Sequence, residues 1–282
     1  MAKKKSKKTI QKAEKTSFFR LLGRLLIIII KLPWTIAKGI HTLQQKFDQS
    51  KQVKEVKTKR EAMTAQYEPF TVTETKQGNF QAFEKHIFAS DSTIGIIVGA
   101  RGSGKTGFGI KLLENLYAKH KKKCFAIGFI EQEMPSWITV AEDPQQLENN
   151  GFVLIDEGGI LFSSRKSMTS ANKMLSDLLL IARHKNLSIL FIAQNSSNLD
   201  VNIIRQADYL VVKKPSLLQK DFERKFIQDI YNKVGDEFKK YGDKKGVTYI
   251  YADKFTGFVE NPLPSFWSVK ISKSFAQVQQ DT

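Results

Sequence analysis

The fold of this chain can be predicted from the stretch IGIIVGARGSGKT, residues 94–106. The apolar run 94–98 has the composition of a buried strand, and the run GARGSGKT, 99–106, satisfies the pattern G-x-x-x-x-G-K-[S/T]. A strand before such a loop and a helix after it direct backbone N–H groups and the helix N-terminus at a phosphate. The stretch therefore predicts a phosphate-binding loop rather than a glycine-rich turn without a ligand.

Short apolar runs alternate with helical patterns around this loop. We expect strands over residues 94–98, 124–130, 152–155, 188–193 and 209–212, and helices over residues 105–119 and 171–184. This alternation predicts an α/β fold, with a mainly parallel sheet and helices on both faces. With the phosphate loop, it indicates a P-loop NTPase of the RecA/ASCE-like kind.

The C-terminal part adds a helix and a hairpin to this expected core. Apolar residues at intervals of four within residues 216–241 predict one amphipathic helix: Leu218, Phe222, Phe226, Ile230, Val234 and Phe238. Residues 247–260, VTYIYADKFTGFVE, predict a β-hairpin with its turn near Asp253 and Lys254. The lone Cys124 lies in an apolar run, which indicates a buried structural thiol and excludes an internal disulfide.

The loop would bind ATP and Mg²⁺. Lys105 would reach the β- and γ-phosphates, and the hydroxyl of Thr106 would hold the metal. Backbone groups of the surrounding residues would cradle the phosphates: Gly99, Ala100, Arg101, Gly102, Ser103, Gly104, Lys105, Thr106 and Gly107.

A second pattern, FVLIDEGG, places Asp156 and Glu157 at the end of an apolar run, fifty positions after Thr106. In this fold, Asp156 would lie beside the metal, and Glu157 would polarise the attacking water. The alternative, an ordinary acidic loop after a strand, is disfavoured by the phosphate loop that precedes it. A base beside the metal favours hydrolysis over phosphoryl transfer to a small molecule.

A third pattern, LLLIARHKNLSILFIAQNSSNLD, places Gln194 after another apolar strand, where it could sense the γ-phosphate by hydrogen bonding. Arg183 ends the preceding helix and could stabilise the transferred phosphoryl group of a neighbouring subunit, with Arg205 as the second candidate. The alternative for Arg183 is electrostatic: a cation at a helix C-terminus is favoured without any function.

The order of GARGSGKT, VLIDEGG, Arg183 and Gln194 resembles the HerA–FtsK superfamily of P-loop ATPases, over roughly residues 90–215. Within it, the chain looks closest to viral genome-packaging ATPases and to zonula occludens toxin-like assembly ATPases of filamentous phages. The resemblance implies an oligomeric, usually hexameric, ring that moves DNA through a central pore or drives virus assembly. The chain departs from the DNA pumps at Ala193, where they often have Thr, so only Gln194 is carried over.

The positive charge of the chain is concentrated in its N-terminal part. Residues 1–60 hold 17 Lys and Arg against 3 Asp and Glu, whereas residues 61–282 hold 28 against 25. This distribution favours a disordered basic tail over residues 1–17, a linker over 44–70 and an ATPase domain over 71–282. The tail is either a solvated, disordered segment or a segment that attracts anionic lipid or nucleic acid.

Residues 18–43 lie between the tail and the linker and form a basic, apolar segment. Its longest uncharged run within 20–31, LLIIII at 25–30, is shorter than the roughly 20 residues of a membrane span. On a helix, its cations form one narrow stripe: Arg20, Arg24, Lys31 and Lys38. This pattern favours a helix in the interface of an anionic membrane, with a tilted span or packing against protein as alternatives. We expect a cytoplasmic, membrane-associated protein, at a host-cell or virion membrane.

The loop SSRKSMTS, residues 163–170, offers Arg165 and Lys166 for contact with a DNA backbone, although a short basic loop is also commonly just solvated. The leading interpretation is a ring-forming ATPase that translocates single- or double-stranded DNA. An alternative is a membrane-anchored ATPase that extrudes virions, with a coat or membrane protein as its partner. A third is a slowly hydrolysing membrane scaffold or switch.

Overall fold

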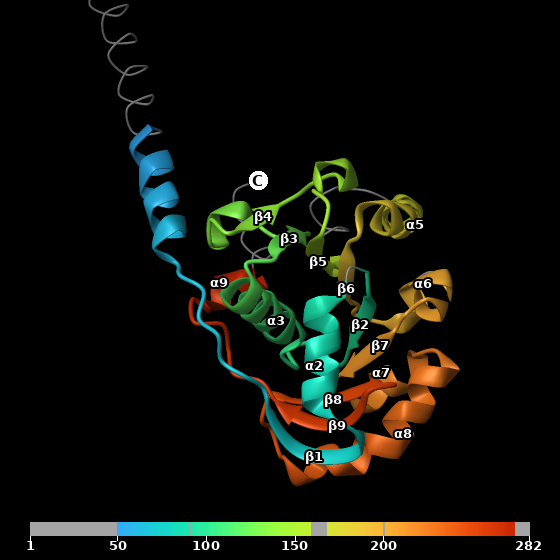
Figure 1. The fold of residues 1–282 in the computed structure, drawn as a ribbon. Coiled ribbons are helices and arrows are strands. Elements are labelled where there is room, and N and C mark those ends of the chain that lie inside the picture. Colours follow the sequence, from blue (N-terminus) through green and yellow to red (C-terminus); the bar gives the residue numbers. More distant parts are fainter. Residues whose placement is uncertain (1–49, 91, 159–167, 200, 274–282) are drawn as a thin grey trace, which may run out of the picture. The chain divides into compact units, whose positions relative to one another are not determined.

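The computed structural model describes residues 50–90, 92–158, 168–199 and 201–273 (Figure 1). The chain divides into two compact units, Met1–Val56 and Lys57–Thr282. Residues 50–62 are helical, and residues 63–70 connect them to the first strand. The predictions for residues 1–17 and 18–43 lie outside the described residues. Among the helices that are described, none is long and apolar enough to span a membrane.

The described part of the second unit is built on one nine-stranded sheet with the order β1-β9-β8-β7-β2-β6-β5-β3-β4. The strands from β7 to β4 pair in parallel, whereas β8, β9 and β1 extend the sheet with antiparallel pairs. The strands are β1 Thr71–Gly78, β2 Ile94–Val98, β3 Lys123–Ile127, β4 Ile138–Val140, β5 Gly151–Asp156, β6 Ser188–Ile192, β7 Tyr209–Val212, β8 Val247–Ala252 and β9 Phe255–Glu260.

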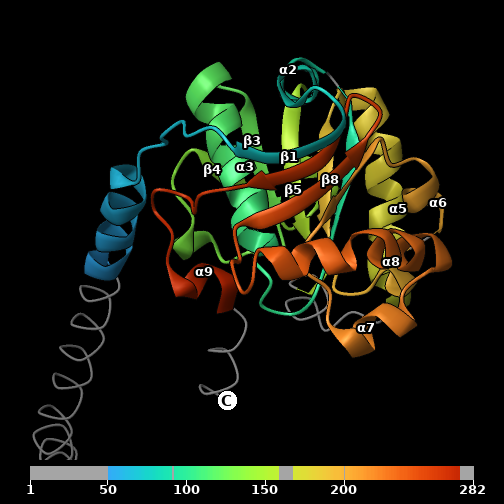
Figure 2. The same ribbon diagram turned by 90° about the horizontal axis from the view of Figure 1, so that it is seen from below.

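Helices cover both faces of this sheet, and Figure 2 shows α3 on one side with α5 and α8 on the other. Buried side chains of α2, α3 and α9 form one apolar cluster with the sheet, and those of α5, α6 and α8 form a second. The helices are α2 Phe80–Ala89, α3 Lys105–His120, α5 Met168–Lys185, α6 Val201–Arg205, α7 Leu217–Phe222, α8 Lys225–Lys240 and α9 Val269–Lys273, with 3₁₀ turns at Glu131–Glu133, Pro144–Gln146 and Ser196–Asn198.

The central strand β2 contributes to both apolar clusters. Ile97 belongs to the cluster of α3, whereas Ile96 and Val98 belong to the cluster of α5 and α8, because successive side chains of a strand point to opposite faces. Because the side chains on both faces of β2 are buried, the strand is apolar throughout. The predicted α/β class, the mainly parallel sheet and the C-terminal hairpin, β8 and β9, are confirmed.

One expected strand ends earlier in the structure. The strand expected over 124–130 is Lys123–Ile127, because the chain leaves the sheet at Gly128, which has a φ of 83°. The thiol of Cys124 is buried in this strand, as predicted, and burial raises its pKa.

The prediction of a single helix within 216–241 is wrong. Glu223 and Arg224 have extended backbone conformations and separate α7 from α8. The carboxylate of Glu223 accepts a hydrogen bond from the N–H of Ser196, at 2.7 Å, and the hydroxyl of Ser196 accepts one from the N–H of Arg224, at 3.1 Å. These bonds fix the two extended residues, Glu223 and Arg224, to the turn that follows β6. Only the second half of the expected apolar face is buried: Ile230, Val234 and Phe238 are in the core, whereas Leu218, Phe222 and Phe226 are exposed.

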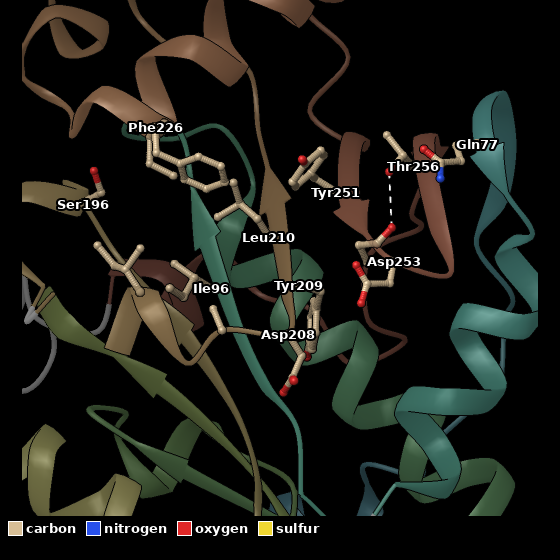
Figure 3. A pocket seen from close by; sticks show the side chains of 14 residues that line it. Gln77, Ile96, Ser196, Asp208, Tyr209, Leu210, Phe226, Tyr251, Asp253 and Thr256 are labelled. Carbon is tan, nitrogen blue, oxygen red and sulfur yellow. Dashed lines mark hydrogen bonds between the residues drawn. The ribbon is translucent and has the colours of Figure 1, made fainter. Parts of the chain in front are cut away.

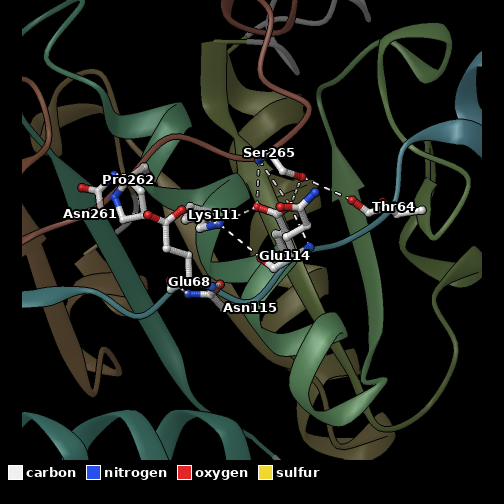
Figure 4. Close-up of polar contacts among 9 residues, drawn as sticks. Thr64, Glu68, Lys111, Glu114, Asn115, Asn261, Pro262 and Ser265 are labelled. Atoms are coloured by element: carbon white, nitrogen blue, oxygen red, sulfur yellow. Dashed lines mark hydrogen bonds and ion pairs between the residues drawn. The ribbon is translucent and has the colours of Figure 1, made fainter.

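A buried polar cluster fixes α3 to segments distant in sequence (Figure 4). Lys111 and Glu114 are both fully buried and form an ion pair at 2.8 Å. Glu114 also accepts hydrogen bonds from the N–H of Gln66, at 3.1 Å, and from the N–H of Ser265, at 3.1 Å. Since buried charges need such partners, α3 has one well-defined position beneath the loop at its N-terminus.

Candidate nucleotide-binding site

The predicted phosphate loop connects β2 to α3 in the central part of the sheet. Gly99 and Gly104 have φ values of 147° and 94°, in the region that favours glycine. A Cβ atom at Gly99 would lie 2.5 Å from the Cβ of Lys213, and one at Gly104 would lie 2.8 Å from the carbonyl oxygen of Lys245. These glycines therefore let the loop turn sharply while neighbouring segments pack against it.

Lys105 is the first residue of α3, and its side chain is folded into the loop. Its ammonium donates to the carbonyl oxygens of Gly99, at 2.7 Å, and Ala100, at 3.0 Å. Burial lowers the pKa of Lys105 to about 8, although the nearby carboxylates of Asp156 and Glu223 oppose this shift. A bound phosphate would be a stronger partner than these carbonyls and would raise the pKa again.

The sheet brings the predicted acidic pair to the same edge as the loop. Strand β6 lies between β2 and β5, and Ile192 of β6 is in register with both Ile97 and Asp156. Asp156 ends β5, and its carboxylate accepts a hydrogen bond from the N–H of Gly158, at 3.0 Å. Because parallel strands end at one edge, Asp156 lies on the side of the sheet where Lys105 begins α3.

Glu157 and Gln194 lie against each other at this edge. Glu157 is buried, and its carboxylate accepts a hydrogen bond from the N–H of Gln194, at 3.3 Å. A Cβ atom at Gly158 would lie only 2.4 Å from the amide nitrogen of the Gln194 side chain. Glycine at position 158 therefore makes room for the predicted sensor beside the predicted base.

The donor set fits a magnesium ion bound together with a nucleotide. Thr106 offers a hydroxyl and Asp156 a carboxylate, and Mg²⁺ typically takes one or two protein oxygens plus phosphate oxygens and waters. The described residues contain no cluster of three or more His, Cys, Asp or Glu side chains that could hold a metal ion by themselves. The remaining ligands of the metal would be phosphate oxygens and waters.

Two polar residues at the site were missed by the sequence analysis. The side chain of Gln219 donates to the carbonyl oxygens of Gly99 and Gln194, and Glu223 is a buried carboxylate near Lys105. Both lie within the helix expected over 216–241, outside its predicted apolar positions. The sequence signal was weak: Glu223 lies between the apolar positions 222 and 226, where a charged residue is expected on a helix, and its partner Ser196 is distant in sequence.

The predicted arginines lie away from the loop of their own chain. Arg183 is exposed in the last turn of α5, where it donates to the side chain of Gln206 at 3.1 Å. This turn leads into the start of β6, whereas the phosphate loop follows the end of β2, so the two lie at opposite edges of the sheet. Arg205 is exposed in the last turn of α6. Arg165 and Lys166 lie outside the described residues.

A pocket of about 380 Å³ lies elsewhere, among α8, β7 and β8 (Figure 3). Phe226 and Tyr251 line it, with their ring centroids 6.2 Å apart. Asp208 also lines it, but its carboxylate already accepts a hydrogen bond from the N–H of Ile94, at 2.7 Å. None of the lining residues belongs to the phosphate loop, and Ser196, the partner of Glu223, is the lining residue that connects the pocket to the candidate site.

The strand, glycine loop and helix, with β6 placed between β2 and β5, define the class: the chain has a P-loop NTPase fold. Residues 108–215 match the family model described as Zonular occludens toxin (Zot). The match confirms, over that segment, the resemblance to zonula occludens toxin-like ATPases. It includes Asp156, Glu157 and Gln194 but begins two residues after Thr106.

Several solved structures are similar at low identity. The genome packaging NTPase B204 from Sulfolobus turreted icosahedral virus 2, in complex with sulfate, is 17% identical with a TM-score of 0.43, and the match covers 62% of this chain and 98% of that chain. The DNA-packaging ATPase B204 from Sulfolobus Turreted Icosahedral Virus is 16% identical with a TM-score of 0.43 and the same coverages. No curated protein matches the chain. At these TM-scores the likeness decides nothing about function.

Proposed function

We propose that this chain is an ATP-hydrolysing motor that assembles into a ring and translocates DNA, in the packaging or export of a viral or mobile-element genome at a membrane. The observation that carries the proposal is the position of Glu157, a buried carboxylate held beside Gln194 at the edge where the phosphate loop lies. A P-loop that only binds a nucleotide does not need a base at this position.

The residues of the site divide the work of hydrolysis among them. Lys105 leaves the carbonyls of its own loop for the phosphates, and Thr106 and Asp156 hold Mg²⁺, which neutralises developing charge when it is bound. Glu157 accepts a proton from the attacking water, and Gln194 hydrogen-bonds to the γ-phosphate. The backbone N–H of Gln194 donates to the carboxylate of Glu157, which holds the residue that would sense the γ-phosphate next to the base.

The remaining groups supply the assembly and its partners. The proposed ring has six subunits. Because Arg183 is exposed and distant from the loop of its own chain, it would act on the nucleotide of a neighbouring subunit. Arg165 and Lys166 would contact the DNA backbone, and residues 18–43 would bind an anionic membrane surface from the cytoplasmic side.

The proposal predicts that Glu157→Gln retains ATP binding and loses hydrolysis, by about 100- to 10,000-fold, because the amide cannot accept the proton of the water. Phosphate release and the affinity for a fluorescent ATP analogue would be measured on the same preparation. The control is Glu142→Gln, which changes an exposed glutamate after β4 and should keep wild-type turnover. Unchanged turnover in Glu157→Gln would remove this residue from the mechanism.

The match to the Zot family model favours one alternative, a membrane-anchored ATPase that extrudes virions and has a coat or membrane protein as its partner. This alternative keeps the ATPase and needs no grip on DNA. DNA binding that weakens with salt and depends on Arg165 and Lys166 supports the translocating motor instead.

A further inference from the structure

We propose that Gln219 is a positioning residue that holds the phosphate loop and the loop of Gln194 at one fixed spacing, so that nucleotide binding on the first is transmitted to the second and to α7. This inference deepens the proposed function and rests on it for its effect on turnover. Its structural part, the spacing of two loops, can be tested whether or not the chain hydrolyses ATP.

The amide nitrogen of Gln219 lies among three acceptors, two of which belong to distant parts of the chain. It donates to the carbonyl oxygen of Gln194 at 2.7 Å, to the carboxylate of Glu223 at 2.9 Å and to the carbonyl oxygen of Gly99 at 3.2 Å. Gly99 begins the phosphate loop, and Gln194 follows β6. A single side chain thus bridges two loops whose residues are far apart in sequence.

Glu223 fixes the orientation of this amide. One oxygen of its buried carboxylate accepts from Gln219, and the other accepts from the N–H of Ser196, at 2.7 Å. If the side-chain amide of Gln219 were flipped, its oxygen would face these three acceptor oxygens and no hydrogen bond would form. The donors of Gln219 are therefore directed at the two loops before any nucleotide binds.

The carbonyl oxygen of Gly99 is shared between Gln219 and Lys105. When Lys105 turns to a phosphate, this carbonyl loses its ammonium partner and keeps the amide of Gln219. A buried carbonyl without a donor would be costly, so Gln219 stabilises the loop in the nucleotide-bound arrangement. The same amide ties this change to the carbonyl of Gln194, whose N–H contacts Glu157.

The bridge also joins the site to α7. The backbone N–H of Gln219 donates to the hydroxyl of Ser216, which caps α7, at 3.2 Å. A displacement of the phosphate loop would therefore pull on the first turn of this helix. Its exposed residues Leu218 and Phe222 would move with it.

The test compares three substitutions in the full chain. Gln219→Leu fills the space without donors, and Gln219→Glu places a second carboxylate beside Glu223. Gln219→Lys retains donors for all three acceptors. The control is Lys220→Ala, on the next residue of α7. Steady-state hydrolysis of ATP with Mg²⁺ is measured for each, and amide hydrogen exchange of residues 99–104 and 194–199 is measured without nucleotide.

We expect Gln219→Leu and Gln219→Glu to lower kcat roughly 100-fold while KM for ATP changes by less than about threefold, because the reacting groups are misplaced and not removed. Gln219→Lys should recover most of the wild-type kcat. Exchange of both loops should be faster in the Leu and Glu variants and unchanged in Lys220→Ala. A role in packing alone predicts the reverse order, with Leu tolerated and Lys harmful.

Either of two results would overturn the inference: wild-type kcat in Gln219→Leu, or exchange of both loops at the wild-type rate in that variant. A wild-type chain that does not hydrolyse ATP would instead refute the proposed function. In that case, the exchange measurement alone decides whether Gln219 fixes the loops.

Discussion

Lys213 follows β7 directly, and its side chain is fully buried beside the phosphate loop. Its ammonium donates to the side chain of Asn261, at 2.8 Å, and to the carbonyl oxygen of Lys245, at 3.1 Å. Burial lowers the pKa of Lys213 to about 7, from 10.5 for the exposed side chain. The sequence could not reveal this environment, because Lys245 and Asn261 come from other elements.

This burial predicts how stability depends on pH. Between pH 7 and 10.5, the unfolded chain keeps a proton on Lys213 that the folded chain has released, so the free energy of unfolding rises with pH in this window. Thermal unfolding from pH 6.5 to 9.5 should show this rise, and Lys213→Met should make it shallower. Lys105, with a pKa of about 8, supplies part of the remaining slope.

The control for this measurement is Lys214→Met, on an exposed neighbour, which should keep the wild-type slope. An equal slope in Lys213→Met and wild type would show that Lys213 does not lose its proton in the folded protein at these pH values.

The elements α7 and α8 show what periodicity can and cannot predict. Apolar residues at intervals of four correctly indicated helix on both sides of Glu223. The same pattern gave no sign of the break, because the break is held by the turn at Ser196. The phosphate loop and the acidic pair were predictable for the opposite reason: their positions follow from strand ends, which a local pattern defines.

The break predicts unequal effects of two similar truncations. Ile230→Ala, in the core, should lower the free energy of unfolding by about 2–5 kcal/mol, because it leaves a cavity. Leu218→Ala, on the exposed side of α7, should change it by less than about 0.5 kcal/mol. Urea denaturation of the full chain measures both. Equal losses would mean that Leu218 is buried in solution, as one continuous helix buried along its apolar face would require.

At the scale of the molecule, most of the parallel part of the sheet and the hairpin of β8 and β9 were predictable, whereas both edge strands were not. Strands β7, β2, β6, β5 and β3 follow from short apolar runs between helices. The strands β1 and β4 were missed, since β1 is mostly exposed and depends on pairing with β9, and β4 is only three residues long. Gln219 was missed for a related reason: its role depends on tertiary contacts with two carbonyl oxygens that are distant in sequence.

In the proposed motor, hydrolysis at this site does work on DNA. The most direct test measures ATP hydrolysis by the full chain with and without double-stranded DNA, at two salt concentrations, with Glu157→Gln as the inactive reference. We expect DNA to increase the turnover several-fold and the increase to weaken as salt rises, because backbone contacts release counterions. Turnover that is the same with and without DNA at both salt concentrations would contradict this proposal.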